Sequence, residues 1–363
     1  MLLGQGGAVS TKRIPNGIAI NASIVALGKW SEFTIGSTGG WGLLIGGGGG
    51  GALGTSAVHG ATGGAVKAWL PVGKYRVWIG QGGDSKGTPL TDNSGYTAHG
   101  GPGGVGTNDS YGGQGGTPTI LERLVNGTWT LFAVAGAGGG GGIHMGSGLP
   151  RAGGGGTWSA HVVTVAAQFI SVSSGSRGTL ASGWGVTPGI LSQLSGGGGA
   201  PYLPATGYSV NSLPADVENQ WAGGKGGDSA TSQRPGGGGG GGFGGGGGGS
   251  EGGSTSLVTA GRGGFITRDG KRWGGISGGG GHASSCAGGG GGGGSYYPPD
   301  GKSGEIVGSC IANTALSAPR AVLLGVVNWG LLPTTTGAGG LGGTSSNKAY
   351  DGGFVFLGST APF

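Results

Sequence analysis

Strand-length apolar stretches alternate with tracts of glycine along this chain. Residues 41–45 (WGLLI) lead directly into the glycine tract 46–51, and residues 128–134 (TWTLFAV) lead into the sequence AGAGGGGG. Residues 354–358 (FVFLG) form another apolar stretch near the C-terminus. Short apolar runs rich in β-branched and aromatic residues are typical of strands. The pattern therefore predicts strands whose ends continue into glycine-rich chain.

Two stretches have the pattern of a β-hairpin. TILERLV and TWTLFAV flank the dipeptide Asn126-Gly127, which supplies the two positive φ angles that a type I′ turn needs. The sequence FITRDGKRW repeats this arrangement with Asp-Gly at 269–270. Residues 74–80 (KYRVWIG) predict a further strand, because Tyr75, Val77 and Ile79 alternate with the other side chains of the stretch.

Helical periodicity is almost absent from the sequence. Residues 159–172 are the only stretch long enough for a helix, and their β-branched content favours a strand instead. Residues 321–332 (AVLLGVVNWGLL) supply a further apolar strand. No stretch approaches the 18 or so apolar residues of a membrane span. The N-terminal residues lack an apolar run of signal-peptide length, so we expect synthesis in the cytoplasm of a host.

Glycine dominates the composition, with 106 of the 363 residues. Tracts of four or more lie at 46–51, 138–142, 153–156, 196–199, 236–242, 244–249, 278–281 and 288–294. Two interpretations are open, a disordered chain or an ordered array. Disordered glycine-rich segments are usually polar and charged, whereas this chain has 9% charged residues, 34% apolar residues and ten tryptophans. The composition favours order.

An extended left-handed helix of the polyproline II type suits tracts of glycine. It has three residues per turn and no internal hydrogen bonds, so its backbone N–H and C=O groups point outward. Neighbouring helices must then supply the partners, and their axes approach closely only where Cβ atoms are absent. We therefore predict an all-β protein in which β-sandwich-like strands are interwoven with a bundle, or lattice, of polyglycine II helices. Pure glycine tracts belong in the interior of this bundle.

The formal charge of +6 does not form a nucleic-acid footprint. Lysines and arginines are scattered singly along the chain, and the densest group consists of Arg268, Lys271 and Arg272. Proteins that bind nucleic acid usually carry a basic stripe or patch. We therefore expect no nucleic-acid partner.

Catalytic and metal-binding motifs are also missing. The five histidines are dispersed without metal-ligand spacing, and neither Cys286 nor Cys310 begins a C-x-x-C motif. The two cysteines are compatible with a disulfide or with free thiols. Matches to G-x-G-x-x-G are inevitable in such a chain and carry no information. We expect a protein that is not an enzyme and that binds no cofactor or metal.

The order of strand, glycine tract, AVKAWLPVGKYRVWIGQGG, Asn-Gly hairpin and FAVAGAGGGGG resembles the glycine-rich domains of bacteriophage tail-fibre and receptor-binding proteins. It is also similar to the glycine-rich extracellular domain of anaplastic lymphoma kinase. The resemblance covers residues 30–300 and implies a β-sandwich-like module with polyglycine II helices built into it. The glycine-dense part, residues 236–294, resembles the distal adhesins of T-even-like phages. In those adhesins, loops at the tip of the glycine lattice bind an outer-membrane protein or lipopolysaccharide.

This resemblance implies a tail-fibre or tail-tip adhesin of a bacteriophage virion. Such a protein binds a host cell-surface receptor, an outer-membrane protein or a surface glycan, without covalent chemistry. The alternative is a purely structural virion protein, such as a spike, fibre cap or decoration protein. In either case we expect a homotrimer.

The chain is expected to divide into two unequal parts. Residues 1–29 are predicted to form an attachment segment that contacts other virion or tail proteins. Residues 30–363 are predicted to form one interwoven domain, with the lattice mainly at 136–300 and C-terminal strands at 301–363.

Connections between glycine tracts are the candidate binding sites, because binding residues collect on loops of a rigid scaffold. The candidate receptor contacts are His282, Ser284 and Ser285 in HASSCA (282–287), Tyr296 and Tyr297 in SYYPPD (295–300), and Trp273 at the end of the second hairpin. For the aromatic residues the alternative is packing against the lattice, and for His282 it is a solvated loop. Phe243 interrupts a glycine tract and is expected to pack on a strand at the edge of the bundle.

Overall fold

The structure is a computed structural model of the chain, and it is all-β without a helix in the residues that it describes. These residues are 13–14, 17–21, 27–36, 38–54, 57, 59–86, 90, 94–143, 152–153, 195–196, 219–229, 234–249, 264–268, 271–274, 287, 289–298, 304–306, 331–343 and 348–358. The predicted fold class is confirmed at this level. No helix in these ranges has the length and hydrophobicity to cross a membrane.

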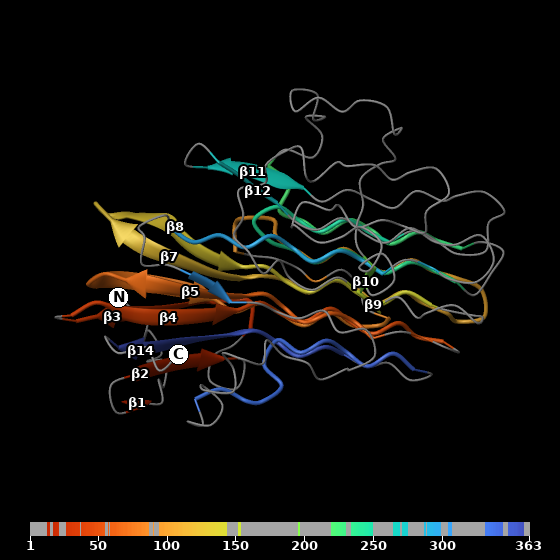
Figure 1. The fold of residues 1–363 in the computed structure, drawn as a ribbon, viewed down its shortest axis with the longest axis horizontal. Helices are drawn as coiled ribbons and strands as arrows, with labels where there is room; N and C mark the ends of the chain where they lie inside the picture. Colours follow the sequence, from red (N-terminus) through yellow and green to blue (C-terminus); the bar gives the residue numbers. More distant parts are fainter. Residues whose placement is uncertain are drawn as a thin grey trace, which may run out of the picture.

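Two antiparallel sheets contain most of the described strands (Figure 1). The six-stranded sheet has the order β1 (Arg13–Ile14), β2 (Gly17–Asn21), β14 (Gly353–Gly358), β4 (Gly40–Ile45), β5 (Ala65–Leu70) and β13 (Gly304–Ile306). The four-stranded sheet has the order β3 (Trp30–Ile35), β6 (Gly73–Trp78), β7 (Thr119–Val125) and β8 (Thr128–Ala135). Two short pairs complete the described strands, β11 (Phe265–Arg268) with β12 (Lys271–Gly274), and β9 (Ala152–Gly153) with β10 (Ser195–Gly196). β2 comes from the predicted attachment segment and pairs with β14 in the sheet.

The hydrophobic core lies between the two sheets. Phe33 on β3 stacks on Tyr75 at a centroid distance of 5.7 Å and contacts Phe354 of β14, in the other sheet, at 5.0 Å. Val77 and Ile79 belong to the same buried cluster. The alternation in residues 74–80 therefore predicted the buried face of β6 correctly.

Both predicted hairpins are present. In the first, Val125 pairs with Thr128 across a two-residue turn, where φ is 50° at Asn126 and 81° at Gly127. In the second, Arg268 of β11 pairs with Lys271 of β12. The predicted strand at 159–172 and most of that at 321–332 lie outside the described residues.

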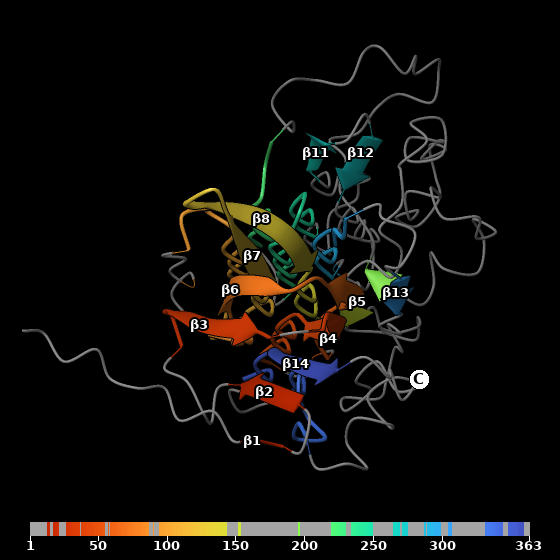
Figure 2. The same ribbon diagram turned by 90° about the vertical axis from the view of Figure 1, so that its left-hand side faces the viewer.

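The strands of both sheets continue into glycine-rich segments on one side of the sandwich (Figure 1). Figure 2 views the molecule from the sandwich side, with the strands in front of these segments. We call the segments together the glycine array. Its members in the described residues are 46–52, 60–64, 80–84, 98–105, 111–118, 136–143, 222–229, 235–242, 244–249, 289–294, 337–343 and 348–352. The array thus includes segments well outside residues 136–300, where we expected most of it.

Successive N–H groups of a glycine segment donate to different neighbours in a cycle of three residues. In the segment 112–117, Gly112 and Gly115 donate to Gly104 and Gly101, Gly113 and Gly116 to Gly141 and Gly138, and Gln114 and Thr117 to Asp84 and Gln81, at 2.8–3.0 Å. Each neighbouring segment is therefore contacted once every three residues. The array is held together by backbone hydrogen bonds between segments that are distant in sequence.

The tract 236–242 shows how completely an interior segment is enclosed. Its N–H groups donate to segments 221–227, 113–116 and 289–294, and its carbonyls accept from segments 101–104, 137–140 and 246–249. A Cβ placed on any residue from Gly237 to Gly241 would lie 2.0–2.4 Å from a backbone carbonyl oxygen. Only glycine permits this approach, so the pure tract is required by the packing.

Candidate functional site

Several segments of the array carry a non-glycine residue at every third position. The positions are His99, Pro102 and Val105; Tyr111, Gln114 and Thr117; Gln81 and Asp84; and Ala222, Lys225 and Asp228. Because the contacts of a segment repeat every three residues, these side chains emerge on one side of it. The pure tracts 236–242 and 289–294 are buried throughout. Side chains able to meet a partner therefore lie on the outside of the array and at its ends.

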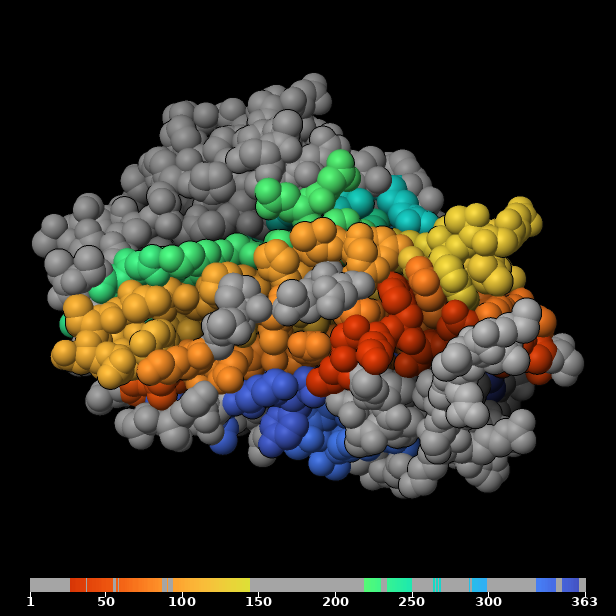
Figure 3. All heavy atoms as spheres, turned by 180° about the vertical axis from the view of Figure 1, so that it is seen from behind, coloured from red at the N-terminus to blue at the C-terminus, as the bar shows by residue number. Residues whose placement is uncertain are grey.

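Two of these edge segments run side by side on the surface seen in Figure 3, residues 219–229 in green and 98–105 in orange. Gly223, Gly226 and Ser229 donate N–H bonds of 2.8–2.9 Å to the carbonyls of His99, Pro102 and Val105. The bonded residues are again three apart in both segments. This pairing fixes a ladder of side chains along the edge of the array.

Asp228 connects the two edge segments. Its carboxylate accepts a hydrogen bond of 2.9 Å from the Val105 N–H and one of 2.5 Å from Lys225 Nζ. Burial acts to raise the pKa of Asp228, but these hydrogen bonds and the Lys225 charge outweigh it and hold the pKa below its usual value. Asp228 therefore remains ionised near neutral pH.

We call the end of the array away from the sheets the distal end. A tight turn there joins segments 98–105 and 111–118, with positive φ angles of 54° at Asn108 and 53° at Asp109. Tyr111 exchanges backbone hydrogen bonds of 2.8 and 2.9 Å with Leu53. Lys86 Nζ lies 4.8 Å from the centroid of the Tyr111 ring and 3.7 Å from Asp109 Oδ1. These contacts hold three connections together at one end of the array.

His59 joins the segment 337–343 to the distal end. Its Nδ1 accepts a hydrogen bond of 2.8 Å from the Gly342 N–H, so the imidazole is held in a tautomer with an unprotonated Nδ1. Burial lowers the pKa of His59. The neighbouring Leu341 is 44% exposed and Val105 is 48% exposed. The distal surface thus combines apolar, aromatic and charged side chains, and its described members are Leu53, His59, Lys86, Val105, Asp109, Tyr111 and Leu341.

The described residues of the two predicted binding loops lie at opposite ends of the array. Ala287, the last residue of HASSCA, donates a hydrogen bond of 2.9 Å to the carbonyl of Ile143, at the distal end. His282, Ser284, Ser285 and Cys286 lie outside the described residues, as does Cys310. Tyr296 pairs with Val134 of β8, at the sandwich end.

Tyr296 is enclosed by other side chains. It is 3% exposed, its ring lies 4.7 Å from that of Phe243, and the Arg268 guanidinium lies 4.7 Å from its centroid. These surroundings agree with the alternative of packing against the glycine-rich segments, and we do not retain Tyr296 as a receptor contact. Tyr297 is half-buried and packs against both core clusters. Trp273 lies in β12 opposite Ile266.

Phe243 has the surroundings that its position in the sequence predicted. It is 1% exposed and packs edge-on against Trp221 at 5.1 Å. Its cluster includes Leu131 and Val134 of β8. Phe243 therefore packs the end of a glycine tract against the four-stranded sheet.

Sequence reasoning missed the distal and edge residues, although a signal for them was present. The repeat X-Gly-Gly in AGGKGGD at 222–228 marks a segment whose Lys225 and Asp228 side chains are exposed, whereas the same repeat at 111–117 buries Gln114 and Thr117. Uninterrupted glycine marks enclosed segments. Reading the two patterns separately would have placed Lys225 and Asp228 on the outside.

The described part of the distal surface presents exposed apolar side chains beside an aromatic ring and charged groups. Within the described part of the chain, no three His, Cys, Asp or Glu side chains gather where they would hold a metal ion. Aromatic side chains such as Tyr111 are enriched at protein interfaces, whereas Lys and Asp are depleted there. The sequence matches no protein-family model and no curated protein.

Proposed function

We propose that the glycine array is a bundle of polyglycine II helices, each surrounded by others. The three-residue cycle of hydrogen bonds supports this, because a helix with three residues per turn presents its N–H groups in three directions. The enclosure of residues 236–242 by six segments supports it as well. Such a bundle is rigid, since its backbone groups are bonded to neighbours rather than to water.

On this basis we propose that the protein is a bacteriophage tail-fibre or tail-tip adhesin. It binds a receptor on the host cell surface, an outer-membrane protein or a surface glycan, without catalysing a reaction. The observation that carries the proposal is the position of the connections: a glycine-rich interior holds several of them together at the distal end. Rigid presentation of loops lowers the entropic cost of binding.

The same proposal assigns the remaining partners. The protein acts in the virion as a homotrimer, and its N-terminal segment contacts other tail proteins. It binds no nucleic acid. His282, Ser284 and Ser285 of HASSCA stay proposed receptor contacts, and Ala287, the described residue of this loop, lies at the distal end.

Binding of the purified protein to susceptible cells tests the adhesin proposal. Val105→Glu places a charge on the distal surface and is expected to weaken cell binding at least about tenfold, since a buried unpaired charge at an interface is costly. Val72→Glu is the matched control, because Val72 is 47% exposed and lies in the turn between β5 and β6, at the sandwich end. Equal binding by the two variants would count against the distal surface.

A purely structural virion role is the second candidate. It is favoured by the rigidity of the array, which serves a spike or fibre cap as well as an adhesin. Under this alternative the wild-type protein does not bind susceptible cells at all. Particles that lack it then fail to assemble, whereas an adhesin is dispensable for assembly and required for adsorption.

A further inference from the structure

We propose a second binding site, on the outer face of the four-stranded sheet, for a saccharide that carries a carboxylate or phosphate group. We call it the Arg76 site, and its members are Trp30, Glu32, Lys74, Arg76 and Trp129. It lies on the sandwich, away from the distal end. The inference therefore does not rest on the function proposed for the distal surface.

Strand register brings these residues to one face. Tyr75 and Val77 of β6 point into the core, so Lys74 and Arg76 lie on the opposite, outer face. Arg76 pairs with Glu32 of β3 on one side and with Glu122 of β7 on the other. Trp129 reaches over from β8, with its ring 5.7 Å from Lys74 Nζ.

The Arg76 side chain is held on three sides. Its guanidinium carbon lies 4.3 Å from the centroid of Trp30 and 4.7 Å from that of Trp129. Its Nε donates a hydrogen bond to Oε2 of Glu122, a residue that is 4% exposed. A guanidinium fixed by two rings and a carboxylate loses little further rotamer freedom when it binds a ligand.

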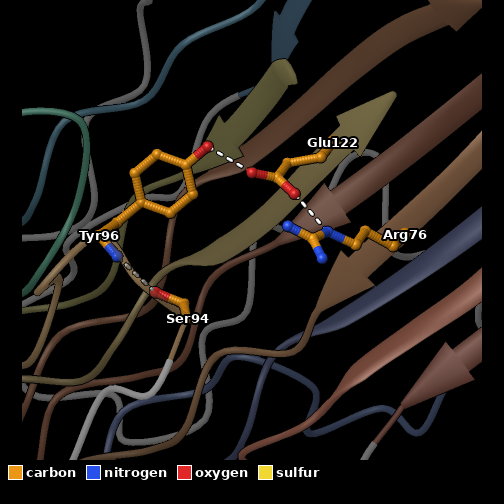
Figure 4. Close-up of polar contacts among 4 residues, drawn as sticks. All are labelled: Arg76, Ser94, Tyr96 and Glu122. Carbon is orange, nitrogen blue, oxygen red and sulfur yellow. Dashed lines mark hydrogen bonds and ion pairs between the residues drawn. The ribbon is translucent and has the colours of Figure 1, made fainter. Parts of the chain in front are cut away.

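A second contact fixes Glu122 in turn. The Tyr96 hydroxyl donates a hydrogen bond of 2.5 Å to Oε1, and Ser94 Oγ accepts one of 3.2 Å from the Tyr96 N–H (Figure 4). Burial, followed by the hydrogen bond to Glu122 and its charge, raises the pKa of Tyr96 well above its usual value, so the phenol stays protonated and donates. Both oxygens of Glu122 therefore have donors.

The arrangement leaves the other end of the guanidinium available. The contact that joins Arg76 to Glu122 is made through Nε (Figure 4), and 23% of the Arg76 side chain is exposed. Terminal guanidinium nitrogens form a planar fork that matches a carboxylate or phosphate. A buried ion pair contributes little net stability because both charges lose hydration. The Glu122–Arg76 pair is thus better explained as a device that orients the fork.

The surroundings of the fork favour a sugar over a simple anion. Lys74 and Glu32 form an exposed ion pair at 2.5 Å, with about half of each side chain accessible. They offer donors and acceptors of the kind that hydroxyl groups need. The half-buried rings of Trp30 and Trp129 supply apolar surface beside these polar groups, the usual composition of a ligand site. An inorganic anion would use only the fork, whereas an acidic saccharide would use all of these groups.

Titration of the full-length chain tests the proposal with four probes: glucuronate, glucose 6-phosphate, glucose and inorganic phosphate. At least one of the two acidic sugars is expected to bind about tenfold or more tightly than glucose, because hydrogen bonds to charged groups are the stronger ones. The same acidic sugar should bind more tightly than inorganic phosphate. Comparison of the two acidic sugars shows which oxyanion the site prefers.

Variants locate the binding. Arg76→Lys keeps the charge but removes the fork, and Lys74→Gln leaves the Arg76–Glu122 contact in place; each should weaken acidic-sugar binding severalfold to tenfold. Lys225→Gln is the matched control, because Lys225 is an exposed lysine paired with a carboxylate on the array. Thermal unfolding confirms that each variant is folded. The proposal is overturned if glucose or inorganic phosphate binds as tightly as both acidic sugars, or if Lys74→Gln and Arg76→Lys bind them like the wild type.

Discussion

At the scale of single residues, protonation of His59 is expected to make the stability of the protein depend on pH. The folded protein holds its imidazole neutral, with Nδ1 accepting from the Gly342 N–H, and burial lowers its pKa below 6.5. The unfolded chain therefore binds this proton more readily. By linkage, the free energy of unfolding falls as pH decreases below about 6.5 and through the window down to the folded pKa.

Comparison with His59→Asn tests this pH dependence. The asparagine side-chain oxygen accepts the Gly342 N–H but does not titrate. Between pH 7.5 and 5.5 the wild type should lose more stability in urea unfolding than the variant does. Parallel curves for the two proteins would show that His59 does not contribute.

At the scale of elements, the strands were largely predictable and their partners were not. Alternation in residues 74–80 and the Asn-Gly pair identified β6, β7 and β8, because a half-buried strand has a period of two and a type I′ turn needs positive φ. β14 lies between β2 and β4 in its sheet, a long-range pairing that no local pattern encodes. The burial of Tyr296 is likewise set by a long-range contact, with Phe243 more than fifty residues away, and the sequence left its packing and its exposure as alternatives.

The glycine segments permit a prediction at this same scale, an alanine scan with a period of three. Lys225→Ala should change the free energy of unfolding by less than about 0.5 kcal/mol, as substitutions at exposed positions usually do. Gly223→Ala and Gly226→Ala bring a Cβ to 1.9 and 2.1 Å from backbone oxygens. They should cost about 1–3 kcal/mol, in the range of overpacking.

Urea unfolding of each single variant measures the change in the free energy of unfolding. Gly36→Ala serves as a glycine control, because nothing lies within 4 Å of a Cβ at that position. It should be tolerated. A flat profile across 222–228 would contradict the polyglycine II proposal.

At the scale of the whole molecule, the same stretches of chain pass through both the sandwich and the glycine array. β4, β6 and β8 run out of the sheets into the array, and segments of the array return as β5, β7 and β14. Phe243, Trp221 and Tyr296 pack the boundary. Because the two parts share chain segments and this packed boundary, we expect them to unfold together.

Native-state hydrogen exchange tests this cooperativity. Amides of Gly238 to Gly241 donate to other segments and should exchange only through global unfolding, with the same free energy as amides of β7. Leu121→Ala, which removes a fully buried side chain between the sheets, should cost about 2–5 kcal/mol. It should lower the protection of the glycine amides by that same amount, although it lies outside the array. If the array keeps its protection in this variant, or exchanges at a lower free energy than β7 in the wild type, sandwich and array are separate cooperative units and the rigidity proposed for the distal end loses its basis.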